Sequence, residues 1–148
     1  MKIRFTAPDM ILLLVILQII MHFIFPIIQI INYPYTYFGI LLIIIGQIPN
    51  VWIYFYFKKV KTSLKIHEKP KKLVTLGLLR ISRNPNYLGM AVTLFGVAIL
   101  LGSLIAFIFP ISFIIWTNSS VIPLEEKNLE KAFGKKYLAY KKRVRKWI

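Results

Sequence analysis

Residues 84–124 decide the fold class. They read NPNYLGMAVTLFGVAILLGSLIAFIFPISFIIWTNSSVIPL, 41 residues without a charged side chain. A single α-helix of that length would extend for roughly 60 Å, about twice the thickness of the hydrocarbon core of a bilayer. The stretch therefore predicts a hairpin of two membrane-spanning helices, with its bend at Leu101-Gly-Ser103 and a kink at Pro110.

Two more apolar stretches precede this hairpin, residues 10–31 and 37–57, and each is long enough to span a bilayer. An uncharged turn at residues 32–36 joins them. The chain begins like a signal peptide, but its apolar run is too long and no small-residue cleavage site follows. We therefore expect the first stretch to be a retained transmembrane helix.

The charges support this interpretation. The net charge is +15 and the sequence pI about 10.2, yet every Lys and Arg falls within residues 2–4, 58–83 or 127–146. Basic blocks alternating with uncharged spans follow the positive-inside rule, so both termini and the 58–83 loop are expected in the cytoplasm. This arrangement argues against a nucleic-acid partner.

Composition narrows the chemistry further. Hydrophobic residues make up 57% of the chain, mean hydropathy is +0.66, and there is no cysteine. A soluble domain of 148 residues could not bury that much apolar surface. Disulfides and thiolate chemistry are excluded, and His22 and His67 lie too far apart in sequence to suggest a metal site.

The C-terminal segment, residues 125–147, has apolar residues at helical spacing and Lys and Arg on the remaining face. It predicts an amphipathic helix that lies in the membrane surface or packs under the bundle, with Gly134 as a candidate interruption. The apolar positions are Leu129, Phe133, Tyr137, Tyr140, Val144 and Trp147.

The predicted fold class is thus all-α, an integral membrane bundle of about four transmembrane helices with a cytoplasmic C-terminal amphipathic helix. We interpret residues 1–148 as a single membrane domain. Within it, residues 1–57 form a two-helix N-terminal part and residues 58–148 form the core that holds the candidate site.

Two groups of residues could carry chemistry. The first is Arg83-Asn-Pro-Asn-Tyr-Leu-Gly89, which also reads as a helix start with Asn84 as cap and Pro85 as first helical residue. The second is the acidic pair Glu125-Glu126, which also reads as a helix boundary. Ionisable groups at membrane depth are costly and often functional. Arg83 and the pair are expected on the same membrane face, where they could hold a small zwitterion.

Several motifs in sequence order resemble the isoprenylcysteine carboxyl methyltransferase and phospholipid methyltransferase families, which are integral membrane enzymes that use S-adenosylmethionine. The likeness covers roughly residues 71–147. Its motifs are Leu73-Val-Thr-Leu-Gly77, Ser82-Arg-Asn-Pro-Asn-Tyr-Leu-Gly89, Glu125-Glu-Lys-Asn-Leu129, Phe133-Gly-Lys-Lys-Tyr-Leu-Ala-Tyr140 and Val144-Arg-Lys-Trp147.

The resemblance implies methyl transfer from S-adenosylmethionine to a membrane-resident amphiphile such as a lipid or an isoprenoid-type acceptor. It implies catalytic roles for Arg83, Glu125 and Glu126. The cofactor contacts that it implies are Lys72, Leu73, Val74, Asn84, Pro85, Tyr87 and Glu125.

The chain departs from the family pattern at three positions. Asn84 stands where a His is commoner, Leu79 where a Tyr is frequent, and Val121 where the eukaryotic isoprenylcysteine enzymes have an Arg implicated in methylation. The cofactor side is therefore retained and the acceptor side is not, so a prenylated-cysteine acceptor is not implied.

The chemistry of the cofactor fits these residues independently. A carboxylate such as Glu125 can pair with its ammonium group, Arg83 with its carboxylate, and Tyr87 can pack on its adenine. Methyl transfer needs alignment and exclusion of water more than a strong base. If the acceptor is an amine, Glu126 is the candidate for taking its proton.

Two other functions stay open. Sterol reductases share a similar C-terminal hairpin but use a nicotinamide cofactor and are usually larger. Alternatively, the basic loop and tail could bind anionic lipid head groups by charge alone, without catalysis. The identity of the acceptor and the oligomeric state are not indicated by the sequence.

Overall fold

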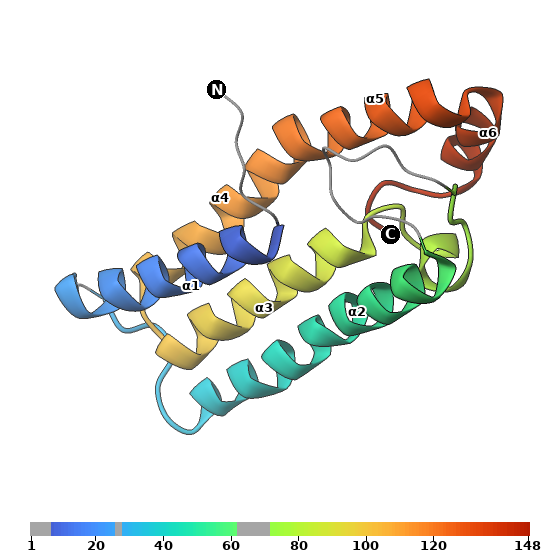
Figure 1. The fold of residues 1–148 in the computed structure, drawn as a ribbon. Helices are drawn as coiled ribbons and strands as arrows, with labels where there is room; N and C mark the ends of the chain where they lie inside the picture. Colours follow the sequence, from blue (N-terminus) through green and yellow to red (C-terminus); the bar gives the residue numbers. More distant parts are fainter. Residues whose placement is uncertain (1–6, 26–27, 62–71) are drawn as a thin grey trace. The chain divides into compact units, whose positions relative to one another are not determined.

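The protein was analysed as a computed structural model, which describes residues 7–25, 28–61 and 72–148 (Figure 1). Regular structure in these described ranges is helical throughout, with a single isolated β-bridge between Gln29 and Ser103. The elements in chain order are α1 (Ala7–Ile24), η1 (Tyr35–Tyr37), α2 (Phe38–Val60), η2 (Gly77–Arg80), α3 (Pro85–Leu101), η3 (Leu104–Phe107), α4 (Ile108–Trp116), the π-helical turn η4 (Thr117–Val121), α5 (Ile122–Phe133) and α6 (Lys135–Arg143).

Two helical stretches are long and apolar enough to cross a membrane, Tyr35–Val60 and Leu104–Phe133. Two shorter apolar helices accompany them, Asp9–Ile24 and Pro85–Leu101. The all-α class is confirmed, and the expected span at residues 37–57 matches α2 closely.

The contacts group into two compact units. One combines residues 1–47 with residues 90–115, and the other combines residues 48–89 with residues 116–148. Helices α2 and α3 contribute to both units, whereas the candidate site residues all fall within the second.

The first unit contains the predicted hairpin bend, which the structure confirms at residues 101–103. Helix α3 ends at Leu101, and Gly102 follows with φ of +70°, a conformation that glycine adopts without steric cost. The Gln29 side-chain amide donates to the Leu101 carbonyl oxygen (3.0 Å). Pro110 lies in the first turn of α4, where its missing N–H costs little.

The first expected span is too long. Helix α1 ends at Ile24, and residues 28–31 are not helical. Pro26 explains the difference, because proline disfavours the α conformation of the residue before it and cannot donate a helical hydrogen bond.

Polar side chains tie the first unit together inside its apolar core. Gln18 is fully buried, and its amide donates to the carbonyl oxygens of Leu94 (3.1 Å) and Ala106 (3.0 Å). Gly39 and Gly96 allow the backbones of α2 and α3 to approach closely, since a Cβ at Gly39 would lie 2.3 Å from the Gly96 carbonyl oxygen. Small residues at helix contacts are typical of membrane bundles.

The C-terminal segment lies in the second unit. The helix that contains Glu125 begins before that residue, because the helical stretch from Leu104 continues to Phe133. The predicted interruption at Gly134 is confirmed, with φ of +51°, and α6 follows as a separate helix. The predicted apolar face is also the covered one, since Tyr137 and Tyr140 are buried.

Candidate active site

The start of α3 places the first motif. The Asn84 carbonyl oxygen accepts a hydrogen bond from the Leu88 N–H (3.1 Å), and Pro85 is the first residue of the helix, as the sequence predicts. The Asn84 side chain has a partner outside this helix, because its amide donates to the Lys146 carbonyl oxygen (2.9 Å). Asn84 therefore ties the start of α3 to the C-terminal tail.

Arg83 is the most connected residue of the site. Its backbone N–H donates to the Arg145 carbonyl oxygen (3.0 Å), and its Nη1 donates to the Lys141 carbonyl oxygen (3.1 Å). Its Nη2 lies 2.8 Å from Glu126 Oε1, and its side chain is only 10% exposed. Such a charge-assisted contact is strong when both partners are largely shielded from water.

Glu126 is held by two cations. Besides Arg83, the Lys141 Nζ lies 2.6 Å from Glu126 Oε2. The three residues come from the loop before α3, from α5 and from α6. This cluster, Arg83–Glu126–Lys141, therefore fixes three segments of the second unit to one another.

Glu125 faces a different partner. The Tyr87 hydroxyl donates to Glu125 Oε1 at 2.7 Å, and Tyr87 is buried in the first turn of α3. Successive helical residues point about 100° apart, so adjacent carboxylates on α5 reach different surroundings. Within the described residues, the ion pairs of the acidic pair all go to Glu126, and Glu125 has only the tyrosine hydroxyl.

The structure thus brings both predicted groups together. The motif at residues 83–87 meets the acidic pair through two separate contacts, Arg83 with Glu126 and Tyr87 with Glu125. Arg83 has partners that the sequence did not indicate, since its Nη groups are engaged by Glu126 and by the α6 backbone.

Residues 72–74 take no part in the hydrogen bonds and ion pairs described above for this group. They form an irregular segment before η2, with Lys72 exposed and Leu73 and Val74 half-buried. Leu73 lines a pocket of about 560 Å³ to which Glu125 and Tyr87 do not contribute.

Several residues of the second unit escaped the sequence reasoning. Lys141 is one of them. Its position next to Tyr140, on the apolar face predicted for α6, could have indicated that it lies near the site. Another is the π-helical turn Thr117–Val121, whose signal is Pro123. A proline removes the hydrogen bond to the carbonyl four residues earlier and crowds it, and a widened turn accommodates both effects.

Tyr140 connects α6 to the loop before α3. Its hydroxyl donates to the Leu79 carbonyl oxygen (2.7 Å), and both residues are buried. Burial raises the pKa of Tyr140 to about 12, against an opposing effect of the nearby Arg83 charge. Burial also raises the pKa of Tyr137, so both hydroxyls stay protonated and able to donate at neutral pH.

Comparison with known proteins gives two matches. The family described as Phospholipid methyltransferase matches residues 34–136. The Arabidopsis thaliana protein named Protein-S-isoprenylcysteine O-methyltransferase B is 34% identical over 110 residues, which cover 72% of this chain and 55% of that protein. The chain therefore spans about half the length of this curated relative. No solved structure matches the chain significantly.

Proposed function

The chain belongs to the phospholipid methyltransferase family, and from this premise we propose that it transfers a methyl group from S-adenosylmethionine to a membrane-resident amphiphile. The observation that carries the proposal is the pairing of the acidic residues with the motif at residues 83–87. Tyr87 engages Glu125 and Arg83 engages Glu126, so the two carboxylates have separate surroundings and can have separate roles.

Glu125 fits the cofactor. S-adenosylmethionine supplies a methyl group made electrophilic by a positively charged sulfur, and it also carries an ammonium group. A shielded carboxylate with one hydroxyl donor and no cation among the described residues suits such a positive group. Tyr87 orients Glu125 through its hydroxyl. Lys72, Leu73, Val74, Asn84 and Pro85 are the further contacts that the family resemblance supports.

Arg83 and Glu126 act as positioning residues. Glu126 is occupied by two cations, so it is a poor candidate for taking a proton from the acceptor. The cluster with Lys141 instead holds α5, α6 and the loop before α3 in register. If proton removal is needed, Glu125 is better placed for it, because among the described residues it has no such ion pair.

We assign contacts with the methyl acceptor to the π-helical turn. Asn118, Ser119 and Ser120 are exposed there, and the Lys146 Nζ donates to Asn118 Oδ1 (2.7 Å). These amide and hydroxyl groups precede Glu125 on the same helical stretch and suit the polar head of an amphiphile. Val121, 7% exposed, ends this turn, where the family resemblance would place an Arg. We therefore propose a polar-headed lipid or isoprenoid-type acceptor other than a prenylated cysteine.

We further propose four membrane spans within one membrane domain. Helices α1 and α3 have 18 and 17 residues, at the lower end of the range of about 17–25 residues that cross a bilayer. Four spans place both termini on the face that holds the basic blocks, and the positive-inside rule makes that face cytoplasmic. The soluble cofactor then arrives from the cytoplasm and the amphiphile from the bilayer.

The proposal is tested by cofactor binding and label transfer. Purified protein in detergent is titrated with S-adenosylmethionine, and membranes are incubated with methyl-labelled cofactor before lipids, small amphiphiles and proteins are separated. Glu125→Gln should abolish binding and transfer. Glu130→Gln, which removes the same charge from an exposed position of the same helix, should preserve both.

Two results would contradict the proposal. One is the absence of saturable S-adenosylmethionine binding by the folded protein. The other is saturable NADPH binding in its place, which would favour a reductase. Equal effects of Glu125→Gln and Glu130→Gln would show that Glu125 contributes only surface charge.

A further inference from the structure

A second site lies in the same unit. A pocket of about 560 Å³ opens between the segment before α3 and helix α6. Pockets of about 300–1,000 Å³ are typical of small-ligand sites in proteins. We call it the basic pocket, and its lining consists of Leu73, Thr75, Leu76, Arg80, Lys136, Tyr140, Arg143 and Val144.

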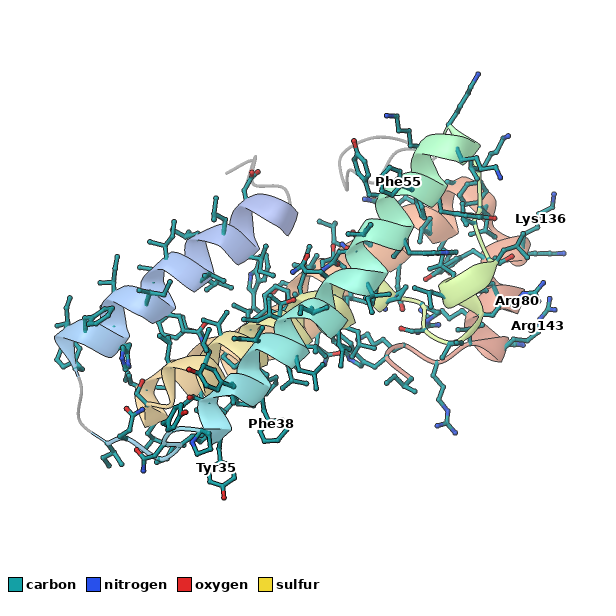
Figure 2. The ribbon with its side chains drawn as sticks, turned by 90° about the horizontal axis from the view of Figure 1, so that it is seen from below. Tyr35, Phe38, Phe55, Arg80, Lys136 and Arg143 are labelled. Atoms are coloured by element: carbon teal, nitrogen blue, oxygen red, sulfur yellow. The ribbon has the colours of Figure 1, made fainter. Side chains whose placement is uncertain are left out.

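Three cations converge on the basic pocket. Arg80 comes from η2, and Lys136 and Arg143 come from the two ends of α6. Figure 2 shows these three side chains projecting at the same end of the unit. No carboxylate lines the pocket, and the ion pairs seen among the described residues involve none of the three. The uncompensated positive charge favours an anionic ligand.

The remaining lining residues narrow the class of ligand. Leu73, Leu76 and Val144 form an apolar wall, while Thr75 and Tyr140 add hydroxyl groups. Arginine and lysine together are typical binders of phosphate, with arginine supplying paired donors. An apolar wall beside such cations suits a phosphate group that carries a short hydrocarbon or glycerol portion.

S-adenosylmethionine is a poor match for this pocket. Its sulfonium and ammonium groups outweigh its single carboxylate, so it carries net positive charge and would be repelled by three unpaired cations. Of the predicted cofactor contacts, only Leu73 lines the pocket, and Glu125 and Tyr87 do not. The basic pocket is therefore distinct from the proposed methyl-transfer site.

We propose that the basic pocket is an accessory site for a phosphate group, presented either by an anionic lipid head group or by a soluble phosphate compound. One contact joins the two walls of the pocket, and a second joins α6 to the Arg83–Glu126 pair. Tyr140 donates to the Leu79 carbonyl oxygen, and the Lys141 carbonyl oxygen accepts from Arg83, which pairs with Glu126. A ligand that bridges η2 and α6 thus stabilises the arrangement that holds the proposed active site. The inference does not depend on the proposed function.

The test uses the full chain in neutral detergent at fixed ionic strength. Binding of dihexanoyl phosphatidic acid, inorganic phosphate and dihexanoyl phosphatidylcholine is measured by calorimetry. The pocket variant is Arg80→Gln, Lys136→Gln and Arg143→Gln combined. The matched control is Lys127→Gln, Lys131→Gln and Lys142→Gln, which removes three exposed charges from α5 and α6 outside the pocket.

We expect saturable binding of phosphatidic acid that weakens at least about tenfold in the pocket variant, because each cation near an anionic head group contributes severalfold to affinity. The control should change it less than about twofold. Preferred binding of phosphatidic acid identifies a lipid head group, and equally strong binding of inorganic phosphate identifies a soluble phosphate compound. The single variant Lys136→Glu should also weaken binding, which provides a second readout with one exposed substitution.

Three outcomes would overturn the inference. The first is that neither phosphate ligand binds the unmodified protein saturably. The second is that phosphatidylcholine binds as tightly as phosphatidic acid, which would indicate recognition of the chains. The third is that the pocket and control variants lose equal affinity, because diffuse surface charge would then explain the binding.

Discussion

Substituting Glu126 by Gln removes the acid that joins Arg83 to Lys141. Arg83 and Glu126 are only 10% and 13% exposed, so the substitution leaves a shielded guanidinium without its counter-charge. Breaking a buried pair in this way costs about 3–5 kcal/mol. Gln keeps the size and polarity of the side chain, so we expect the lower end of this range, about 3 kcal/mol. Lys141 is 38% exposed, and Lys141→Gln should cost less than about 1 kcal/mol.

The free energy of unfolding is measured by titration with sodium dodecyl sulfate in mixed micelles, for Glu126→Gln and Lys141→Gln, and for Arg83→Met and Glu126→Leu alone and combined. The double variant should cost less than the sum of its single substitutions, because no uncompensated charge remains. Equal losses for Glu126→Gln and Lys141→Gln would refute the reasoning, as would strict additivity of the Arg83 and Glu126 substitutions.

Three further predictions follow from single contacts. Tyr87→Phe removes the 2.7 Å hydrogen bond to Glu125. We expect about tenfold weaker S-adenosylmethionine binding in calorimetry and a loss of about 1.5–3 kcal/mol in the free energy of unfolding, since hydrogen bonds to charged groups contribute about that much to stability. Gly39→Ala places a Cβ 2.3 Å from the Gly96 carbonyl oxygen and should lower unfolding free energy by about 1–3 kcal/mol in the same detergent titration. Burial raises the pKa of Tyr140 from 10.0 to about 12, so the contribution of its protonated hydroxyl to stability is complete below pH 10 and is lost as the pH rises through about 12. The Tyr140→Phe variant should therefore lose less unfolding free energy than the unmodified protein over that pH interval. The same alkaline profile for both proteins would contradict the assignment.

The sequence predicted the helical elements where local signals agree with the packing. The uncharged, mostly apolar stretch at residues 37–57 became α2, and Gly102 marked the bend because glycine readily adopts positive φ. The first span was predicted too long because apolar composition continues past Pro26, although the proline ends the helix. Hydropathy measures solvation, whereas the helix end is set by backbone geometry.

In the C-terminal half, the sequence predicted a helix boundary where the helix in fact continues. The change from uncharged to charged residues at Glu125 predicted a boundary, but the backbone stays helical from Leu104 to Phe133. Pro123 did not end this stretch, because the preceding π-helical turn accommodates its ring and its missing donor. Gly134 did end it, since its backbone has positive φ. A change from uncharged to charged residues indicates where the surroundings of the side chains change, but it does not indicate where a helix ends.

The different partners of Glu125 and Glu126 could not be predicted from the local sequence. Glu125 and Glu126 are identical in type and adjacent, so no motif distinguishes the carboxylate that meets cations from the one that meets a tyrosine. The roughly 100° step of the helix separates them, and α6 decides the outcome by bringing Lys141 beside Glu126. Because Arg83 and Lys141 already pair with Glu126, Glu125 is the member of the pair that our proposal assigns to the ligand. Under that proposal the cluster contributes to function as well as to stability, since it keeps the cations on Glu126.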